Sequence, residues 1–295
     1  MKRNHRIMQI GFGLMLLALL ICMGNNSYTW LRKPVFLSCC METSVGSNQS
    51  ASKVVFKLQY ITNSSDKRQV MNISFREVPE MYFFASESLP QEGLVSFYSN
   101  VNLPMGQKLG KYSLHTVYVY QNNFFREEWE GEKELNTAEI RFSDGFSMTT
   151  NIGRILLYSE AVTEGALDSK LYSNNNVMNE YRSVFQANKK LTILSLNSPY
   201  KKEVASFIDI KVDDKKLDKI AGTIYNQYDN IAVNISINTT DKNSMSYDMY
   251  NIAPKLCYRD ENGVDGYIRV PNIEWVRPFK TFKDTLNYLK ERGAI

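Results

Sequence analysis

The chain has 295 residues, of which 43% are hydrophobic and 22% are charged, and its 35 Lys and Arg against 31 Asp and Glu give a formal net charge of +4. These proportions are ordinary for a globular protein and exclude collagen, a disulfide-rich miniprotein and wholesale disorder. Four surplus charges are also too few to predict a nucleic-acid partner, which needs a concentrated basic surface. The length leaves room for two domains of about 150 residues.

An apolar run near the N-terminus is the strongest single signal in the sequence. Lys2, Arg3 and Arg6 precede it, and it extends from Ile7 to Met23, broken only by Gln9. At about 1.5 Å per residue, a helix of this run measures roughly 26 Å, just enough to cross a hydrocarbon core of about 30 Å. The positive-inside rule then places the N-terminus in the cytoplasm. We therefore predict a single-pass protein of the cell membrane with an extracytoplasmic body.

Three fates are open for this segment: a retained anchor, a cleaved secretory signal or a lipoprotein leader. An anchor needs no special residues after the run, whereas a cleavage site needs small ones, for which Cys22-Met23-Gly24 is a passable candidate. A lipoprotein needs a small residue before the modified cysteine, and Ile21 is bulky. We favour the anchor, and the other two fates stay open.

Composition divides the chain into regions. Residues 1–24 form the predicted cytoplasmic tip and membrane segment, and residues 25–52 are rich in polar residues and predict a tether. Strand patterns fill residues 53–160 and 180–295, which we predict to be a first and a second β domain. Between them, residues 161–179 lose the alternation and contain an Asn tract, which predicts a linker.

Alternating apolar and polar residues predict short strands in both domains. The predicted strands of the first domain are 54–60, 70–75, 116–120, 138–142, 146–150 and 152–158. Those of the second are 181–186, 191–196, 207–212, 222–228, 231–237, 254–258 and 267–270. Asp144-Gly145 between two of the runs is a hairpin signal. The predicted fold class is mainly β: an N-terminal transmembrane helix, two antiparallel β-sandwich-like domains and a short C-terminal helix.

The C-terminal helix has clear boundary signals. Thr281 followed by Asp284 is an acidic version of a capping box, and Gly293 can end the helix after Arg292. Phe282, Leu286 and Leu289 recur at helical spacing and form one apolar stripe. We predict a helix over residues 282–292 whose stripe packs on the second domain, with a partner-binding helix as the alternative.

The two predicted domains share a short sequence pattern. Asn63-x-x-Asp66 precedes the run at 70–75, and Asn226-x-x-Asp229 precedes the run at 232–237. Each pattern predicts a strand, a turn and a strand. Duplication of one sandwich and a chance match between similar strands both explain it.

Four cysteines are present, and Cys22 lies inside the membrane run. The adjacent Cys39 and Cys40 could bridge each other only in a strained ring. A cross-link of one of them with Cys257 and three unpaired thiols are the two alternatives that stay open.

The sequence lacks the residues for most catalytic chemistry. Its only two histidines are His5 and His115, and it contains no zinc, dinucleotide or phosphate-loop motif. A Cys–His hydrolase built on His115 has no nucleophile context around the cysteines. We therefore assign no catalytic, cofactor-binding or metal-binding residue and predict no cofactor.

Two acidic segments are candidates for chemistry. Five glutamates surround Trp129, at positions 127, 128, 130, 132 and 134, and could serve a sugar, although interleaved Arg126 and Lys133 favour a solvated loop. Asp260, Asn262 and Asp265 resemble part of a calcium loop. Val264 stands where a ligand is needed, so a hairpin turn at Asn262 explains that segment more simply.

The leading functional hypothesis is a non-enzymatic, membrane-anchored binding or accessory module of a surface assembly, with a protein partner at the cell surface. It depends on the predicted topology and on the missing catalytic motifs. One alternative is a surface glycan-acting enzyme that uses the carboxylates near Trp129. Another is a lipid-anchored solute-binding protein, although the sequence lacks the βαβ pattern of the usual two-lobed fold.

Overall fold

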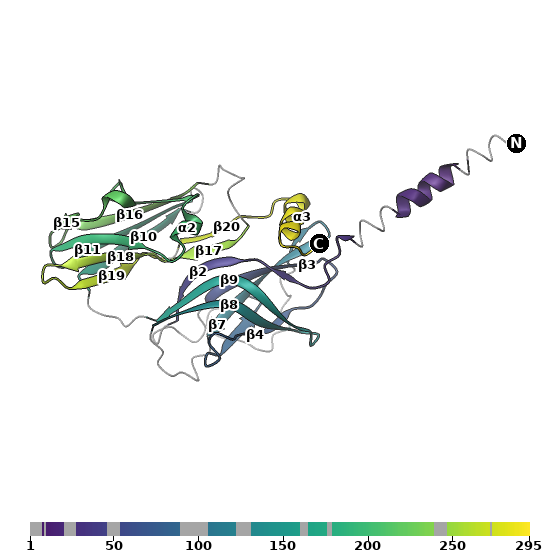
Figure 1. The fold of residues 1–295 in the computed structure, drawn as a ribbon, viewed down its shortest axis with the longest axis horizontal. Coiled ribbons are helices and arrows are strands. Elements are labelled where there is room, and N and C mark those ends of the chain that lie inside the picture. The colour runs from purple at the N-terminus through teal and green to yellow at the C-terminus, as the bar shows by residue number, and fades with distance from the viewer. Residues whose placement is uncertain are drawn as a thin grey trace.

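The computed structural model of the protein describes residues 8, 10–20, 28–45, 54–88, 106–121, 131–159, 165–175, 179–238, 247–271 and 273–295. Within these residues the chain is mainly β, with several antiparallel sheets and a short C-terminal helix (Figure 1). That part of the predicted fold class is confirmed. Buried residues form two separate clusters, one in each of two sandwiches.

The first sandwich packs a sheet of five strands against a sheet of six. The five-stranded sheet has the order β1 (Val35–Phe36), β3 (Val54–Asn63), β7 (Tyr112–Gln121) and β5 (Phe83–Ser86), with β6 (Gln107–Leu109) also paired to β7. The six-stranded sheet has the order β20 (Ile273–Val276), β17 (Met249–Ile252), β2 (Cys39–Ser44), β9 (Ser147–Ser159), β8 (Gly131–Phe142) and β4 (Val70–Phe75). The Asp144-Gly145 hairpin joins β8 to β9 as predicted, with a positive φ at the glycine.

The second sandwich packs a sheet of five strands against a sheet of four. One sheet has the order β10 (Leu167–Asn175), β11 (Glu180–Ala187), β16 (Asn230–Ile237), β13 (Ile208–Val212) and β14 (Lys215–Lys216). The other has the order β15 (Ile224–Tyr225), β12 (Leu191–Asn197), β18 (Lys255–Asp260) and β19 (Asp265–Arg269). Two short helical segments, α2 (Lys201–Val204) and η2 (Leu217–Lys219), complete this unit.

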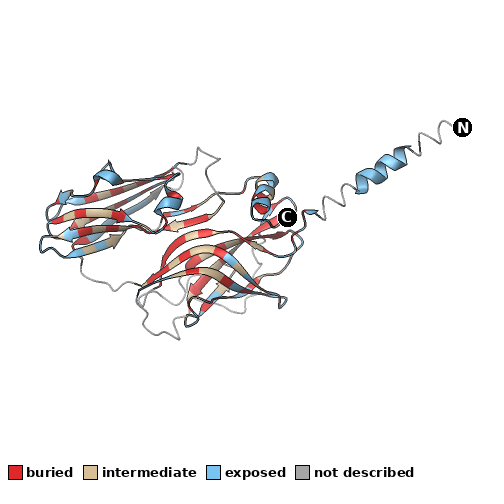
Figure 2. Cartoon of the chain, viewed as in Figure 1, coloured by how far each residue is buried: buried red, intermediate tan, exposed pale blue. Residues whose placement is uncertain are grey.

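Strands β17 and β20 belong to both units. They extend the six-stranded sheet of the first sandwich, and Met249 on β17 packs in the first core. The next residue, Tyr250, and Trp275 on β20 pack in the second core instead. Because successive side chains of a strand point to opposite faces, two short strands can close one core and cover the other. Figures 1 and 2 show this pair between the two sandwiches, with buried residues on both sides.

The predicted tether is wrong over residues 35–44, which form β1 and β2. Strand β2 lies inside the six-stranded sheet and pairs in parallel with both β9 and β17, so this sheet is mixed and not antiparallel throughout. Cys39, Met41 and Glu42 are all buried although they do not share one face. A strand covered on both faces loses the alternation that marks half-buried strands, which is why the sequence does not reveal it.

The predicted linker is also wrong where the structure describes it. Residues 167–175 form β10, an edge strand that pairs with β11 along most of its length. Its side chains from Asp168 to Ser173 are all exposed. Alternation arises from burying one face of a strand, so an edge strand exposed on both faces carries no such pattern. Whether each sandwich folds independently stays a prediction.

The N-terminal apolar run is described only in part, as a helix over residues 10–20. Within the described ranges no helix has both the length and the apolar character that a membrane span requires. The predicted transmembrane helix reaches beyond the described residues at both ends, and it is not confirmed.

The C-terminal helix α3 (Phe282–Glu291) has the predicted capping box. Thr281 Oγ1 accepts a hydrogen bond from the Asp284 N–H at 3.1 Å, and Asp284 Oδ2 accepts one from the Thr281 N–H at 2.9 Å. The predicted docking is wrong, because Tyr288 and Leu289 are buried in the core of the first sandwich. Phe282 is 40% exposed. The stripe is therefore displaced from Phe282 towards Tyr288, which apolar spacing alone does not reveal.

We expect Leu289→Ala to destabilise the protein by about 2–5 kcal/mol, because it removes a fully covered side chain and leaves a cavity. Urea unfolding of the purified chain measures this change. The control is Phe282→Ala on the same helix, where 40% of the residue is exposed and the expected loss is smaller. Equal losses from the two variants would show that α3 is not docked through Leu289.

Candidate functional site

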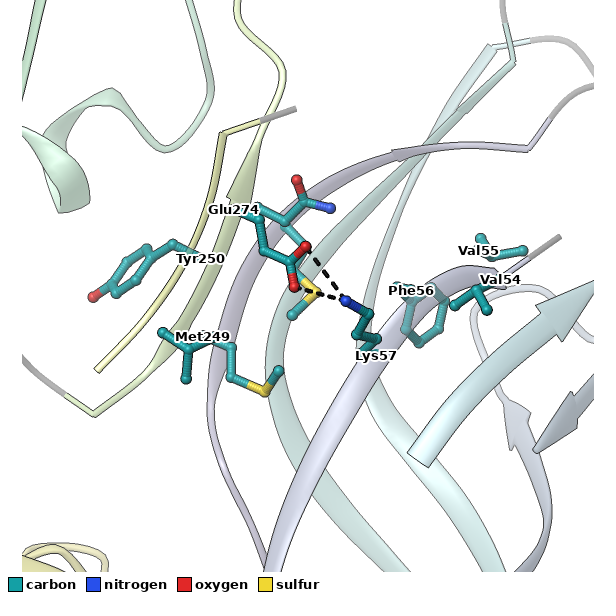
Figure 3. A pocket seen from close by; sticks show the side chains of 10 residues that line it. Val54, Val55, Phe56, Lys57, Met249, Tyr250 and Glu274 are labelled. Carbon is teal, nitrogen blue, oxygen red and sulfur yellow. Dashed lines mark hydrogen bonds and ion pairs between the residues drawn. The ribbon is translucent and has the colours of Figure 1, made fainter. Parts of the chain in front are cut away.

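A groove lies in the first sandwich between β3 and the β17–β20 pair, and Figure 3 shows its lining. Lys57 on β3 and Glu274 on β20 point toward one another and form an ion pair with a nitrogen–oxygen distance of 3.0 Å. Apolar side chains line much of the remainder: Met41, Val54, Val55, Phe56, Met249 and Val276. The Oδ1 atom of Asn251, in the same lining, is buried and has no hydrogen-bond partner within the described chain.

The groove is small for a ligand site. Its volume is about 170 Å³, whereas sites for drug-sized molecules and cofactors enclose about 300–1,000 Å³. Its one ion pair is between side chains that are 40% and 51% exposed, which contributes little to binding or to stability. This hollow therefore gives no support to the solute-binding alternative.

A buried ion pair joins the two sandwiches. Glu42 on β2 is fully buried, and its Oε2 atom lies 2.8 Å from Nη1 of Arg269 on β19. Ser198, which follows β12, donates a hydrogen bond to Glu42 Oε1 at 2.5 Å. The carboxylate belongs to the first sandwich and both of its partners belong to the second. The pair therefore holds the two units against each other.

Arg269 is held by groups from both units. Its guanidinium donates to the Ala253 carbonyl at 2.9 Å and to Glu132 Oε1 at 3.0 Å, and it lies 3.6 Å from the centre of the Tyr158 ring. Lys255 Nζ also donates to Glu132 Oε1, at 2.8 Å. Burial raises the pKa of the Glu42 carboxyl, although hydrogen bonds from Ser198 and the nearby Arg269 act against that rise. The carboxylate thus depends on its partners.

A second cation reinforces the same junction. Arg154 on β9 makes two hydrogen bonds to Glu134 on β8, at 2.9 and 3.1 Å, and one to Glu203 on α2 at 3.0 Å. Its guanidinium also lies 5.0 Å from the centre of the Tyr200 ring. Because Glu203 and Tyr200 come from the second sandwich, Arg154 bridges the two units as Arg269 does.

His115 takes part in a cluster inside the first sandwich. Its Nδ1 atom lies 3.3 Å from Glu87 Oε2, and its ring stacks on Tyr60 at 4.9 Å. Tyr60 Oη donates to Glu87 Oε1 at 2.6 Å, and the Val70 N–H donates to the same oxygen at 2.8 Å. Burial raises the pKa of the Tyr60 hydroxyl. Glu87 is thus engaged on both oxygens, which suits a role in holding strands together.

The three described cysteines are free thiols, so neither Cys39 nor Cys40 bridges to Cys257 in this structure. Cys39 is buried, and burial raises its thiol pKa well above the usual value. Burial, with Asp248 as a further cause, raises the pKa of Cys40 to about 11. Only a thiolate is a good nucleophile, so Cys39 and Cys40 are poorly suited to covalent catalysis at neutral pH.

The acidic segment around Trp129 is described only from residue 131 onward. Of its glutamates, Glu132 pairs with Lys255 and Arg269, and Glu134 pairs with Arg154. A hydrogen bond from Lys255 lowers the pKa of the Glu132 carboxyl. A glycosidase acid needs a raised pKa, so Glu132 is unsuited to that role. The remaining glutamates of the group and Trp129 lie outside the described residues.

The segment that resembles a calcium loop is a hairpin turn. Asp260 Oδ1 accepts hydrogen bonds from the Asn262 and Val264 N–H groups, both at 2.9 Å, and Gly263 has a φ of +79°. Asp265 pairs with Arg259 across the hairpin. No group of three metal-ligating side chains occurs among the residues that the structure describes.

Strand β10 presents an exposed sheet edge in the second sandwich. It is the outermost strand of its five-stranded sheet, and its neighbour β11 covers only one of its edges in the described chain. Leu171 and Tyr172 on β10 are 50% and 43% exposed. A register shift lies between Ser169 and Leu171, and the pairing from Leu171 to Asn175 is regular. The sequence carries no signal for this edge.

No family model matches the chain, and no curated protein matches it. Among solved structures, protocadherin gammaB7 EC3-6 is 8% identical with a TM-score of 0.22, over 81% of this chain and 47% of that one. The human desmocollin-1 ectodomain is 8% identical with a TM-score of 0.18, over 80% and 57% of the two chains. An α-L-rhamnosidase from Dictyoglumus thermophilum is 10% identical with a TM-score of 0.20, over 81% and 29%.

The chain therefore spans from 29% to 57% of the length of these three proteins. Likeness at these scores carries no argument about what this chain binds or does.

Proposed function

We propose that the protein is a non-enzymatic binding module, anchored in the cell membrane through Ile7 to Met23, whose extracytoplasmic body binds a segment of a partner protein along β10. The observation that carries the proposal is the exposed edge of this strand. An edge strand offers a row of backbone N–H and C=O groups to one more strand, and exposed apolar side chains add contact area. The occupant that fits is an extended segment of a surface protein.

The exposed N-terminal helix supports the anchor. In the helix over residues 10–20 every described side chain is exposed, including Phe12 at 65% and Leu14 at 62%. A helix that is apolar all round is stable only where its whole circumference is covered by protein or lipid. Nothing in the described body covers these side chains, so a bilayer is the environment that suits them.

The engagement of the acid–base groups supports a binding role over an enzymatic one. Glu132 and Glu134 pair with cations at the junction. Glu87 binds His115 and Tyr60 inside the first sandwich. A catalytic acid or base must instead face a site that a substrate can reach. The pairing of Glu132 with Lys255 and Arg269, together with that of Arg154 with Glu203, joins the two sandwiches and so holds β10 at a set place relative to the first sandwich.

Site-specific photo-crosslinking in intact cells tests the proposal. A photoreactive amino acid replaces Leu171 on β10 or, as the matched control, Ile224 on β15, another strand at a sheet edge with a similarly exposed apolar side chain. We expect a discrete adduct from position 171 and none from position 224. Adducts of equal yield at both positions, or an adduct only at position 224, would contradict partner binding at β10.

A further inference from the structure

One end of the first sandwich, where the described chain resumes at Tyr28, gathers three segments that are far apart in the sequence. They are residues 28–33, residues 107–112 at the β6–β7 turn, and residues 279–283 at the start of α3; we call them together the neck surface. Tyr112 Oη donates to the Thr29 carbonyl at 2.6 Å. The Phe282 ring stacks on the Tyr112 ring with 5.6 Å between centres. Figure 1 shows α3 at this end of the molecule.

The neck surface is strongly basic. Its 17 residues contain six Lys or Arg and no Asp or Glu: Arg32, Lys33, Lys108, Lys111, Lys280 and Lys283. The chain as a whole has 35 basic and 31 acidic residues, so the rest carries 29 basic against 31 acidic residues. Asp284, the next residue along α3, accepts hydrogen bonds from the Lys280 and Thr281 N–H groups. With it included, six basic residues and one acidic residue leave this surface with a net charge of +5. All six except Lys111 are exposed.

Exposed aromatic residues lie among these cations. Tyr28 is 63% exposed, Trp30 is 49% exposed and Phe282 is 40% exposed. Tyr28 and Trp30 lie in the first segment of the neck surface, and Phe282 lies in its third segment, on α3. Tyr and Trp side chains are favoured at the level of lipid headgroups, because their rings bury apolar area and their polar atoms stay hydrated. Lys and Arg beside them suit anionic headgroups.

The length of the chain limits how far this surface can lie from a membrane. Tyr28 follows Met23 by five residues, which span at most about 18 Å when fully extended. Thr29 is then fixed to the body by Tyr112, and Asn63 fixes Leu31 through two hydrogen bonds of 2.7 and 3.1 Å. The body therefore cannot swing away on a long tether.

From this arrangement we propose that the neck surface binds the outer leaflet of the membrane, with its basic residues on anionic lipid headgroups. The proposal depends on the membrane anchor proposed above and adds a second contact, to which residues 107–112 and 279–283 contribute although they are distant from the anchor in the sequence. Contact with the membrane through both residues 28–33 and the start of α3 fixes the tilt of the body. The second sandwich, at the opposite end in Figure 1, then points away from the lipid.

The test uses the full chain in vesicles of phosphatidylcholine and phosphatidylglycerol that contain a lipid with a nitroxide on its headgroup. Phe282→Trp places a fluorophore on the neck surface, and Tyr228→Trp places one on the second sandwich, where Tyr228 is 67% exposed against 40% for Phe282. Gln107→Trp, exposed on β6, is a second probe of the neck surface that avoids the ring packing of Phe282. For each variant, the measured signal is its tryptophan emission minus that of the parent chain.

We expect the nitroxide lipid to quench the Phe282→Trp and Gln107→Trp emission at least about twofold more than the Tyr228→Trp emission. The reason is that a nitroxide on a lipid headgroup quenches only a fluorophore that lies close to the headgroups, where the basic residues would hold the neck surface. Adding Lys280→Glu and Lys283→Glu should lower the quenching, as should vesicles of phosphatidylcholine alone. Equal quenching at the neck surface and at position 228 would overturn the proposal. So would neck quenching that is the same in neutral and anionic vesicles.

Alkaline extraction of the same vesicles separates this proposal from the anchor. If the chain stays with the lipid but the neck probes are not quenched, the neck proposal fails and the anchor stands. If the chain is released, the anchor itself fails.

Discussion

Replacing Arg269 by methionine should destabilise the protein by about 3–5 kcal/mol, because removing one partner of a buried pair leaves an uncompensated charge. The charge left behind is that of Glu42, whose side chain is 1% exposed. The Ser198 hydroxyl still donates to it but supplies no charge. Urea unfolding at neutral pH measures the loss. Because the pair joins the two sandwiches, we also expect the unfolding transition to broaden or divide.

The same variant should lose stability as the pH rises. Burial already raises the pKa of Glu42 in the folded chain, and losing Arg269 raises it further. The unfolded chain then releases this proton at a lower pH than the folded chain does. Stability is greatest below the unfolded pKa and falls as the pH passes up towards the folded one. Melting temperatures measured between these two pKa values should fall as the pH rises. A rise would contradict a buried Glu42 carboxyl with a raised pKa.

Two further variants isolate the buried charge as the cause. Lys255→Met removes a cation from Glu132, which is 44% exposed, so its expected cost is under about 1 kcal/mol. Adding Glu42→Gln to Arg269→Met removes the stranded carboxylate and should recover part of the loss. A double variant as unstable as Arg269→Met alone would locate the damage in packing against the Tyr158 ring.

Gly153→Ala should cost more than about 3 kcal/mol, because a strained backbone and a steric clash coincide at this position. Gly153 has a φ of +92°, and a Cβ atom there would lie 2.2 Å from the Cys39 carbonyl oxygen on the neighbouring β2. The backbone of one of the two strands must move to relieve this contact. Strand β2 is covered on both sides by other strands, so it has little room to move.

Gly145→Ala is the matched control, since Gly145 has a φ of +86° but no atom within 4 Å of its would-be Cβ. It should cost only the backbone strain, about 1–2 kcal/mol. Thermal or urea unfolding compares the two. If both glycines tolerate alanine equally well, the close approach of β2 to β9 is not as the structure has it.

Sequence reasoning recovers the elements whose signals are local. The capping box at Thr281 and the turns at Gly145 and Gly263 depend on residues a few positions apart, and all three are present. Strands with one buried face, such as β11 and β16, alternate in burial and are predicted nearly to their ends. The Asn-x-x-Asp pattern also marks a turn in both sandwiches, because Asp66 and Asp229 each donate a backbone hydrogen bond to the asparagine carbonyl.

The elements missed are those whose environment is set by distant parts of the chain. Strand β2 is buried on both faces, whereas β10 is exposed on both faces from Asp168 to Ser173, and each situation removes the alternation that identifies a strand. The docking of α3 on the first sandwich depends on β17 and β20 returning the chain to that sheet. No periodicity in residues 282–292 contains this information.

The junction could not be predicted for the same reason. Glu42 and Arg269 are 227 residues apart, and each is an isolated charge in its own segment. In the sequence, Glu132 is one of a local acidic group, and its pairing with Lys255 and Arg269 requires the second sandwich to be in place. A pair of opposite charges so distant in sequence gives no signal in a single sequence.

Partner binding along β10 at a fixed place relative to the proposed anchor requires that the two sandwiches form one body. Pulsed electron–electron double resonance measures the distance distribution between two nitroxide labels. The labels are attached by orthogonal chemistry at Asn287 on α3 and at Lys190 in the second sandwich. Both residues are exposed, and neither belongs to the junction. We expect a single narrow distance distribution in the parent chain and a broad one in Arg269→Met. A broad distribution in the parent chain would contradict a fixed junction.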